Sequence, residues 1–402
     1  MPAFGRAMLA HWWLDPDATY LNHGTVGATP RAVLQAQQDW QRRIETAPAR
    51  YVIRDAVRTT ADDTDGRPRT APLLIREVAA TVAREFGARG EDLVFVDNTS
   101  TGVNAVLRSM RFQPGDEILL LDHAYGAVLR TAEFVARASG ARVVTVPVPF
   151  PADADTPATV VRAIEGALTP RTRLAVLDHI TSGSALVLPI AEMTACCRAR
   201  GVPVLVDGAH VPGALALDIP AIGADWYVAN LHKWAFVPRA CAILWVAPQR
   251  RTGLHPAVIS WGLDNGLAQE FDWTGTRDTS AVLAAPAAFA FMREVLGTQA
   301  MRTWNHGLVW RMAHALSTRW SRPFDTPESM IGTMAAVLLP ARLQALGPQA
   351  APALKDWLFH ARRIESQVLT VGEHLVVRLA AQVYNDEADF ERLADAIDAW
   401  PA

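Results

Sequence analysis

Lysine is almost absent from this 402-residue chain. Of its 38 basic residues, only Lys233 and Lys355 are lysines, and the other 36 are arginines. A reaction that needs a side-chain primary amine therefore has two candidate positions.

Cysteine is also scarce. The three cysteines, Cys196, Cys197 and Cys241, are too few and badly spaced for a disulfide framework or a cysteine-based metal site. The adjacent pair lies in a segment expected to be helical, and we interpret it as buried packing. No metal site is predicted.

Neither an excess of charge nor a long apolar run is present. The formal net charge of −3 gives no electrostatic reason to expect nucleic acid or an anionic membrane as a partner. No run approaches the roughly 18 apolar residues of a membrane span, and the first 17 residues lack the pattern of a signal peptide. We therefore expect a cytoplasmic protein with no membrane partner.

Seven short apolar runs alternate with amphipathic segments in the middle of the chain. Their Val and Leu content without strict alternation is typical of strands that are buried on both faces. The alternation of strands and helices predicts an α/β fold with a mostly parallel seven-stranded sheet flanked by helices. The predicted strands are 93–96, 117–122, 141–148, 173–180, 202–209, 225–231 and 241–247.

The pattern changes after Arg277 and predicts a smaller C-terminal α+β domain. A long helix at 280–297 is followed by strands near 333–340 and 375–385, with helices at 354–364 and 388–400. We expect a large domain over 31–277 and a small one over 278–402. Residues 1–30 are expected to pack on the small domain and the site entrance. The polar stretch 62–70 predicts a mobile loop.

Two predicted strands end in polar residues that can bind two different parts of a ligand. One end suits an anionic group, and the other suits a ring nitrogen. Asn98-Thr99-Ser100-Thr101-Gly102 joins a strand to a helix, where free N–H groups and hydroxyls attract an anion. Asp207 ends the strand in VLVDGAHVPGA, where its carboxylate can pair with a protonated pyridine nitrogen. The alternatives are an ordinary helix cap in the first case and a turn-capping aspartate in the second.

Two basic residues complete the set. Lys233 follows a buried-type strand in ANLHKW, where desolvation lowers the pKa of an amine and keeps it nucleophilic. Arg378 lies between apolar neighbours in LVVRLAAQVYN and is suited to clamp a carboxylate. The alternatives are a solvated lysine and an internal ion pair. The four features together predict a pyridoxal phosphate (PLP) site, with PLP held as a Schiff base on Lys233.

The chain resembles the class-V aminotransferase superfamily of PLP enzymes of fold type I. Within it, the chain is similar to the isopenicillin N epimerase-like branch, which includes cysteine-sulfoxide lyases. The resemblance extends nearly from end to end, through YLNHGTVGATPRAV, PARYVIRD, DNTSTGVNAV, DHAYGAV, DHITSGSALVLPI, VDGAHVPGALALDI, NLHKW, WTGTRDTSA and VRLAAQVYN.

The resemblance implies roles for particular residues. Asp207 would pair with the ring nitrogen, His210 with the phenolic oxygen, and Arg378 with the substrate carboxylate. His123 or Tyr125 would lie over the ring or act as an acid, and the sequence does not choose between them. The implied phosphate and cofactor contacts are Thr99, Ser100, Thr101, Thr181 and His232, with Thr276 reaching the cofactor of a neighbouring subunit in a homodimer. The implied entrance residues are Asn22, His23 and Tyr51.

The reaction remains open at this point. Removal of a Cα proton by Lys233 followed by β-elimination requires the fewest further groups, and DHAYGA resembles the lyase members. We therefore expect a C–S lyase that acts on an S-substituted cysteine. Amino-acid epimerisation, transamination, reaction of the carbanionic intermediate with O2, and a catalytically inactive scaffold are the alternatives. Residues 323–378 contain no cysteine, so persulfide formation by the desulfurase route is not expected.

Overall fold

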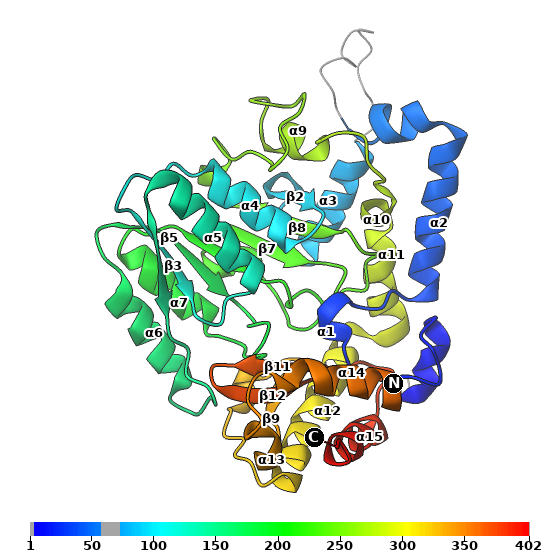
Figure 1. Cartoon of the computed structure of the whole chain (residues 1–402). Helices are drawn as coiled ribbons and strands as arrows, with labels where there is room; N and C mark the ends of the chain where they lie inside the picture. Colours follow the sequence, from blue (N-terminus) through cyan, green and yellow to red (C-terminus); the bar gives the residue numbers. More distant parts are fainter. Residues whose placement is uncertain (1–3, 58–72, 402) are drawn as a thin grey trace.

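The computed structural model describes residues 4–57 and 73–401 (Figure 1). The loop predicted at 62–70 lies outside the described residues.

A seven-stranded sheet forms the centre of the larger part of the molecule, in the order β2-β8-β7-β6-β5-β3-β4. Only β8 runs antiparallel to its neighbours, β2 and β7. All seven predicted strands are present, and the predicted α/β class with a mostly parallel sheet is confirmed. Their bounds are β2 Leu93–Val96, β3 Glu117–Leu121, β4 Arg142–Val146, β5 Thr172–Asp178, β6 Val204–Asp207, β7 Trp226–Asn230 and β8 Ala242–Val246.

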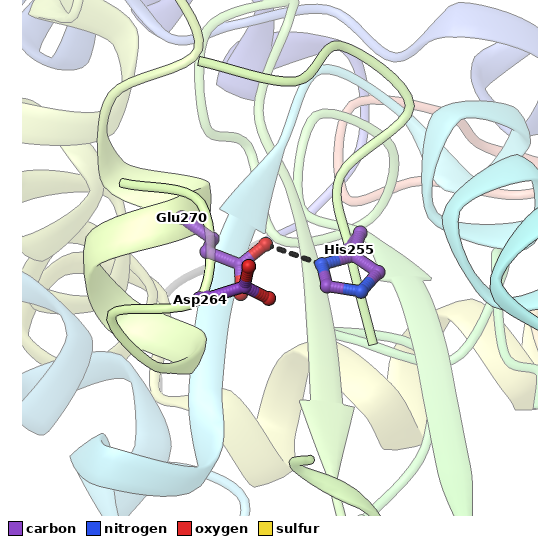
Figure 2. A group of neighbouring side chains, drawn as sticks. All are labelled: His255, Asp264 and Glu270. Atoms are coloured by element: carbon purple, nitrogen blue, oxygen red, sulfur yellow. Dashed lines mark hydrogen bonds and ion pairs between the residues drawn. The ribbon is translucent and has the colours of Figure 1, made fainter. Parts of the chain in front are cut away.

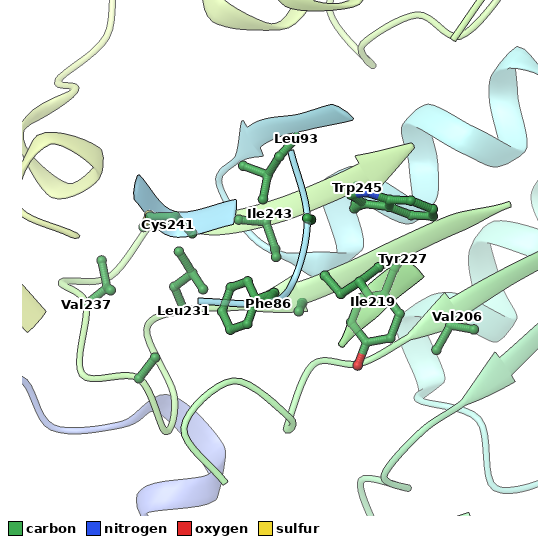
Figure 3. Close-up of a cluster of buried hydrophobic side chains, with 14 of the residues drawn as sticks. Phe86, Leu93, Val206, Ile219, Tyr227, Leu231, Val237, Cys241, Ile243 and Trp245 are labelled. Atoms are coloured by element: carbon green, nitrogen blue, oxygen red, sulfur yellow. The ribbon is translucent and has the colours of Figure 1, made fainter. Parts of the chain in front are cut away.

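Alternate residues of a strand point to opposite sides of the sheet, and each face packs against its own group of helices. Leu93 and Phe95 pack into one hydrophobic cluster, and Val94 and Val96 into another. Figure 3 shows part of the first cluster, around Tyr227 and Trp245. Helices α3 Leu74–Arg84, α6 Thr156–Ala167, α7 Ile190–Ala199, α10 Ser280–Leu283 and α11 Ala285–Ala290 contribute to the first cluster, and α4 Thr99–Ser109, α5 Gly126–Ser139 and α9 Leu267–Asp272 to the second.

The smaller part contains an antiparallel sheet of order β11-β12-β9. Arg378 lies on its central strand, where it is paired with Gln367 on one side and Ala336 on the other. The helices and strands of the smaller part are α12 Thr298–Arg319, β9 Met334–Leu338, α13 Ala341–Gln344, α14 Ala350–Arg362, β11 Gln367–Val371, β12 His374–Ala380 and α15 Glu387–Asp398.

The N-terminal segment lies against the smaller part (Figure 1). Strand β1 Thr19–Tyr20 pairs in parallel with β10 Ile364–Glu365, and the Gly5 N–H donates to the Val383 carbonyl at 2.8 Å. Two helices follow, α1 His23–Val26 and α2 Arg31–Thr46. The remaining short helices are η1 Arg6–His11, η2 Ala49–Arg54, η4 Gly90–Asp92, α8 Ile219–Ile222, η5 Pro248–Arg250, η6 Phe291–Leu296 and η7 Glu328–Met330.

The domain boundary at residue 277 stays a prediction. Helices α10 and α11 pack in the core of the larger part, and the change from one hydrophobic cluster to the next falls within α12, between Met301 and Leu308. Among the described residues, no single helix meets the length and hydropathy needed to cross a membrane. The residues Ser280–Leu296 and Thr298–Arg319 meet the criteria only as a pair bent by 76°.

Candidate active site

The carboxyl ends of β5, β6 and β7 meet the start of α4 around a cavity of about 330 Å³, which is where open α/β sheets place their ligands. The strands supply Asp178, Asp207 and Asn230, and Lys233 follows three residues after β7. We call this space the inner cavity. It is lined by Thr25, Asn98, Thr99, Ser100, Tyr125, Asp178, Ile180, Ser182, Asp207, Ala209, His210, Asn230, His232 and Lys233.

A second cavity of about 310 Å³ adjoins the first, because Tyr125 and Ser182 line both. We call it the outer cavity. The smaller antiparallel sheet contributes one of its sides. It is lined by Asp122, His123, Ala124, Tyr125, Gly126, Ser182, Gly183, Ser184, Gln367, Leu369, Thr370, Val371, Gly372 and Arg378.

The amine of Lys233 is held in a desolvated position. Burial lowers the pKa of Lys233 to about 7; the nearby Arg378 lowers it as well, and Asp207 opposes them. Its Nζ lies 3.1 Å from His210 Nε2. A substantial fraction of this amine is therefore uncharged near neutral pH, as a nucleophile requires.

His210 is fixed through both ring nitrogens. The Trp234 Nε1–H donates to His210 Nδ1 at 3.4 Å, so the proton of the neutral ring belongs on Nε2, where it can be donated to the uncharged Lys233 amine. Burial, together with the charges of Lys233 and Arg378, holds the pKa of His210 well below its usual value. The neutral form is the one that this arrangement stabilises.

Two buried carboxylates lie side by side in the inner cavity. Asp207 on β6 is the register partner of Asp178 on β5, and both are 4% exposed. Burial raises the pKa of both carboxyls, and the neighbouring Asp207 raises that of Asp178 further. The two buried carboxylates repel each other when both are charged. A positively charged ring nitrogen next to Asp207 would offset this repulsion and would therefore be stabilised here.

The turn after β6 needs glycine at position 208. A Cβ at Gly208 would lie 2.2 Å from the Tyr227 hydroxyl oxygen. Asp207 Oδ1 accepts the Ala209 N–H at 2.9 Å across this turn, so the close approach at Gly208 contributes to the orientation of the carboxylate.

The start of α4 offers polar donors to the inner cavity. Asn98 caps the helix by accepting the Thr101 N–H at 2.9 Å, and Asn230 accepts the Thr99 N–H at 3.1 Å. Thr99 and Ser100 line the cavity, whereas Thr101 does not. His232 lines it too, with Nδ1 3.0 Å from the Cys241 carbonyl oxygen, and burial lowers its pKa to about 4.

Arg378 is a buried cation that has no counter-ion in the part of the chain that the structure describes. It is 4% exposed, and its NH1 and NH2 groups donate to the Ser182 carbonyl at 2.7 Å and to Thr25 Oγ1 at 2.8 Å. Its Nε has no hydrogen-bond partner, and no carboxylate in 4–57 or 73–401 forms an ion pair with it. The alternative of an internal ion pair therefore does not hold for the described residues.

His123 and Tyr125 both reach the outer cavity, but they are held differently. His123 Nδ1 lies 2.8 Å from Ser184 Oγ, and the ring stacks edge-on against Phe150, with the centroids 6.2 Å apart. Tyr125 is the N-cap residue that precedes α5 and is 49% exposed. Thr181 is fully buried and bonds to Ser184 and Leu186, so its hydroxyl is not among the groups that line either cavity.

Several other predicted residues do not themselves line either cavity. His23 was expected at the entrance, but it is completely buried; its ring nitrogens lie 2.7 Å from the Tyr384 hydroxyl and 3.0 Å from the Lys233 carbonyl. Asn22 is also buried and lies 3.4 Å from an Arg378 nitrogen. Tyr51 on η2 and the exposed Thr276 line neither cavity.

The sequence prediction omitted several residues that the fold brings to the site. Asp178 and Asn230 each end a strand of the sheet, as Asp207 does. Their position at a strand end could have identified them from the sequence as site residues. Ser182, Ser184 and Gln367 carried no comparable signal, because their place depends on a turn and on β11.

One further polar cluster lies outside both cavities (Figure 2). His255, Asp264 and Glu270 bring one ligand-type atom each within 4.8 Å of one another. The buried Glu270 already has a partner, because its carboxylate accepts from His255 Nδ1 at 2.6 Å. We interpret this pair as a structural hydrogen bond that holds the loop before α9 against the helix.

Comparison with known proteins identifies the family. The Aminotransferase class-V family model matches residues 20–333. A probable chloroplastic L-cysteine desulfhydrase of Arabidopsis thaliana is 34% identical, and the alignment covers 96% of this chain and 83% of the relative. Isopenicillin N epimerase of Streptomyces clavuligerus is 32% identical, with 96% of each chain covered.

Solved structures share the fold. A lysine-to-alanine mutant of C-DES, with glycine covalently linked to its PLP cofactor, matches with a TM-score of 0.76 at 20% identity, covering 98% of each chain. A cysteine desulfurase from Thermococcus onnurineus matches with a TM-score of 0.78 at 17% identity, covering 99% of this chain and 98% of the other. The chain belongs to the class-V aminotransferase family of enzymes.

Proposed function

We propose that this enzyme binds PLP covalently through Lys233 and catalyses β-elimination on an S-substituted cysteine, as a C–S lyase. The products would be a thiol, pyruvate and ammonia. The observation that carries the proposal is the proximity of two basic groups with complementary roles: Lys233, with its lowered pKa, and Arg378, which is buried and has no counter-ion among the described residues.

The donor set of the inner cavity fits PLP. Asp207 offers a carboxylate to a ring nitrogen, Lys233 an amine to the aldehyde, and Thr99 and Ser100 hydroxyls to the phosphate. The helix start adds a favourable dipole for an anion. When bound, PLP withdraws electrons from the substrate Cα and so makes its proton removable.

Lys233 is the base that we assign to the Cα proton. Because the amine is uncharged at a pH above about 7, it can accept that proton, and His210 keeps it oriented at 3.1 Å. Proton transfer by a positioned side chain of matched pKa is efficient near neutral pH.

Arg378 is the group that we assign to the substrate carboxylate. Its guanidinium is anchored by Ser182 and Thr25, and it lines the outer cavity together with His123 and Tyr125. A substrate bound there would extend its side chain among groups that can hydrogen-bond a departing sulfur.

Epimerisation is the second candidate, because two relatives above 30% identity are named isopenicillin N epimerase. An epimerase needs a second acid on the opposite face of the ring from Lys233. Elimination does not, and relatives of similar identity are named L-cysteine desulfhydrase, which supports our preference. Transamination, reaction with O2 and an inactive scaffold rank below both.

The distinguishing experiment is incubation of the PLP-loaded enzyme in heavy water with S-substituted cysteines and with D- and L-amino acids. Pyruvate together with a thiol would support elimination. Deuterium at Cα with inverted configuration and no pyruvate would favour the epimerase. A keto acid formed with transfer of the amino group would favour transamination, and a protein that takes up no PLP would favour the scaffold.

We further infer a homodimer. Thr276 is exposed, and the loop before α9 exposes the large apolar side chains Val258, Ile259, Trp261 and Leu263. Such a patch on one loop is typical of an interface. Light scattering on the purified protein would test this inference. The cytoplasmic location stays a prediction; the name of the Arabidopsis relative places that protein in the chloroplast.

A further inference from the structure

A short turn between β5 and α7 connects the outer cavity to the core. It comprises residues 181–186, and we call it the 181–186 turn. Its two ends are joined by an antiparallel bridge between Ile180 and Val187. Thr181 and Ser184 are 0% and 2% exposed, and Ala185 adopts a left-handed φ of 58°. A left-handed non-glycine residue is held only where its surroundings enforce it.

Hydrogen bonds run through this turn to His123. The Leu186 N–H donates to Thr181 Oγ1 at 2.8 Å, Thr181 Oγ1 lies 2.7 Å from Ser184 Oγ, and Ser184 Oγ lies 2.8 Å from His123 Nδ1. This series of hydrogen bonds therefore starts at a backbone N–H donor and ends at a ring nitrogen of His123, which lines the outer cavity.

The direction of these hydrogen bonds follows from the first one, which the Leu186 N–H donates. A backbone N–H can only donate, so Thr181 Oγ1 accepts there and must place its own proton elsewhere. Ser184 Oγ at 2.7 Å is a better acceptor position than the Leu186 carbonyl oxygen at 3.5 Å. With this direction, Ser184 donates to His123 Nδ1, which would place the proton of the neutral ring on Nε2.

The charges around His123 agree with a neutral ring. Burial lowers the pKa of His123, while Asp122 acts in the opposite direction. The other polar or charged groups that line this cavity are Tyr125, Ser182, Ser184, Gln367, Thr370 and Arg378. Among all these lining groups, Asp122 is the only one that raises the pKa of His123, and burial outweighs it.

The same turn holds the residue that we assign to the substrate carboxylate. The Ser182 carbonyl accepts from Arg378 NH1 at 2.7 Å. His123 and Arg378 belong to different parts of the fold, and both form hydrogen bonds with this six-residue turn.

We propose that Ser184 and Thr181 are positioning residues that fix His123 as the tautomer with its proton on Nε2. His123 then presents an N–H donor to the substrate's departing sulfur, whose negative charge it stabilises by a hydrogen bond without losing the proton. The inference rests on the proposed C–S lyase function and chooses His123 over Tyr125 for this role.

The tautomer can be measured directly by NMR of the full-length protein labelled with ¹⁵N-histidine, with His123→Gln used to assign the signals. The wild type is expected to show a protonated Nε2 and an unprotonated Nδ1 at His123. Ser184→Ala is expected to give a mixture of the two neutral tautomers. A protonated Nδ1 in the wild type, or an unchanged tautomer in Ser184→Ala, would overturn the proposal.

Thr181 supplies a matched pair of variants. Thr181→Ser keeps the hydroxyl and should retain the wild-type tautomer, whereas Thr181→Val keeps the shape, loses the hydroxyl and should not. In the PLP-loaded enzyme, Ser184→Ala should lower kcat about tenfold with little change in KM, as expected when a transition-state donor is misaligned but not removed. An equal kcat in Ser184→Ala and the wild type would contradict the role.

The two proposals fail separately. The NMR measurement does not depend on any reaction, so a wild-type Nε2–H tautomer that depends on Ser184, found together with an epimerase activity, would refute the lyase and leave the positioning intact. Lyase activity with a tautomer that is independent of Ser184 would refute the positioning alone.

Discussion

Replacement of Arg378 by lysine tests the proposed carboxylate site while it keeps the positive charge. In the wild type, NH1 and NH2 are fixed by Ser182 and Thr25 at 2.7 and 2.8 Å, which leaves the planar guanidinium oriented and its Nε free. A lysine has one nitrogen, which cannot keep both anchors and also bind a carboxylate in a bidentate manner.

Weakening a buried charged pair costs about 2–4 kcal/mol, which corresponds to a rise of about 30- to 700-fold in KM at ~1.4 kcal/mol per decade. Steady-state kinetics on an S-substituted cysteine would measure it. The control substrate is the corresponding amine without the carboxylate, for which Arg378→Lys should change little. An unchanged KM for the amino acid, or an equal change for both substrates, would refute the assignment.

Three further predictions follow from the inner cavity. Asp207→Ala should lower turnover by several orders of magnitude, because an unprotonated ring withdraws electrons poorly; near-full activity would contradict this role. Covalent uptake of PLP by the apoenzyme should accelerate as the pH rises through about 7, where the Lys233 amine loses its proton; a rate that rises only near pH 10 would show an ordinary lysine. Gly208→Ala should destabilise the fold by about 1–3 kcal/mol through its collision with Tyr227, whereas Gly166→Ala, a helical position with open space around it, should be neutral or stabilising. Equal melting temperatures for these two variants would contradict the packing argument.

The strands of the large sheet were predictable because most are buried on both faces and read as apolar runs; the edge strand β4 is partly exposed but keeps three valines. Lys233, Asp207 and Arg378 could be selected for the same reason: each interrupts or ends an apolar run with a charged group. The long helix α12 was missed, since Asn305 and Ser317 lie on its buried face and Trp304 and Trp310 blur its apolar periodicity. Strand β11 was missed because polar Gln367 and Thr370 interrupt a five-residue segment.

The remaining differences arise from contacts between distant segments. His23 lies beneath Lys233 because α1 packs against the chain around residue 233, where a Cβ at Gly27 would come 2.2 Å from the His232 carbonyl oxygen. Thr181 bonds within its own turn, and its place there depends on the left-handed conformation at Ala185. Neither contact has a local pattern in the sequence.

The covalent attachment of PLP at Lys233 is the central claim, and the scarcity of lysine makes it directly testable. Borohydride reduction of the PLP-loaded protein, followed by digestion and mass spectrometry, should place the pyridoxyl group on the peptide that contains Lys233. The label should disappear in Lys233→Ala and persist in Lys355→Ala. A label on Lys355, or one that survives in Lys233→Ala, would contradict the account.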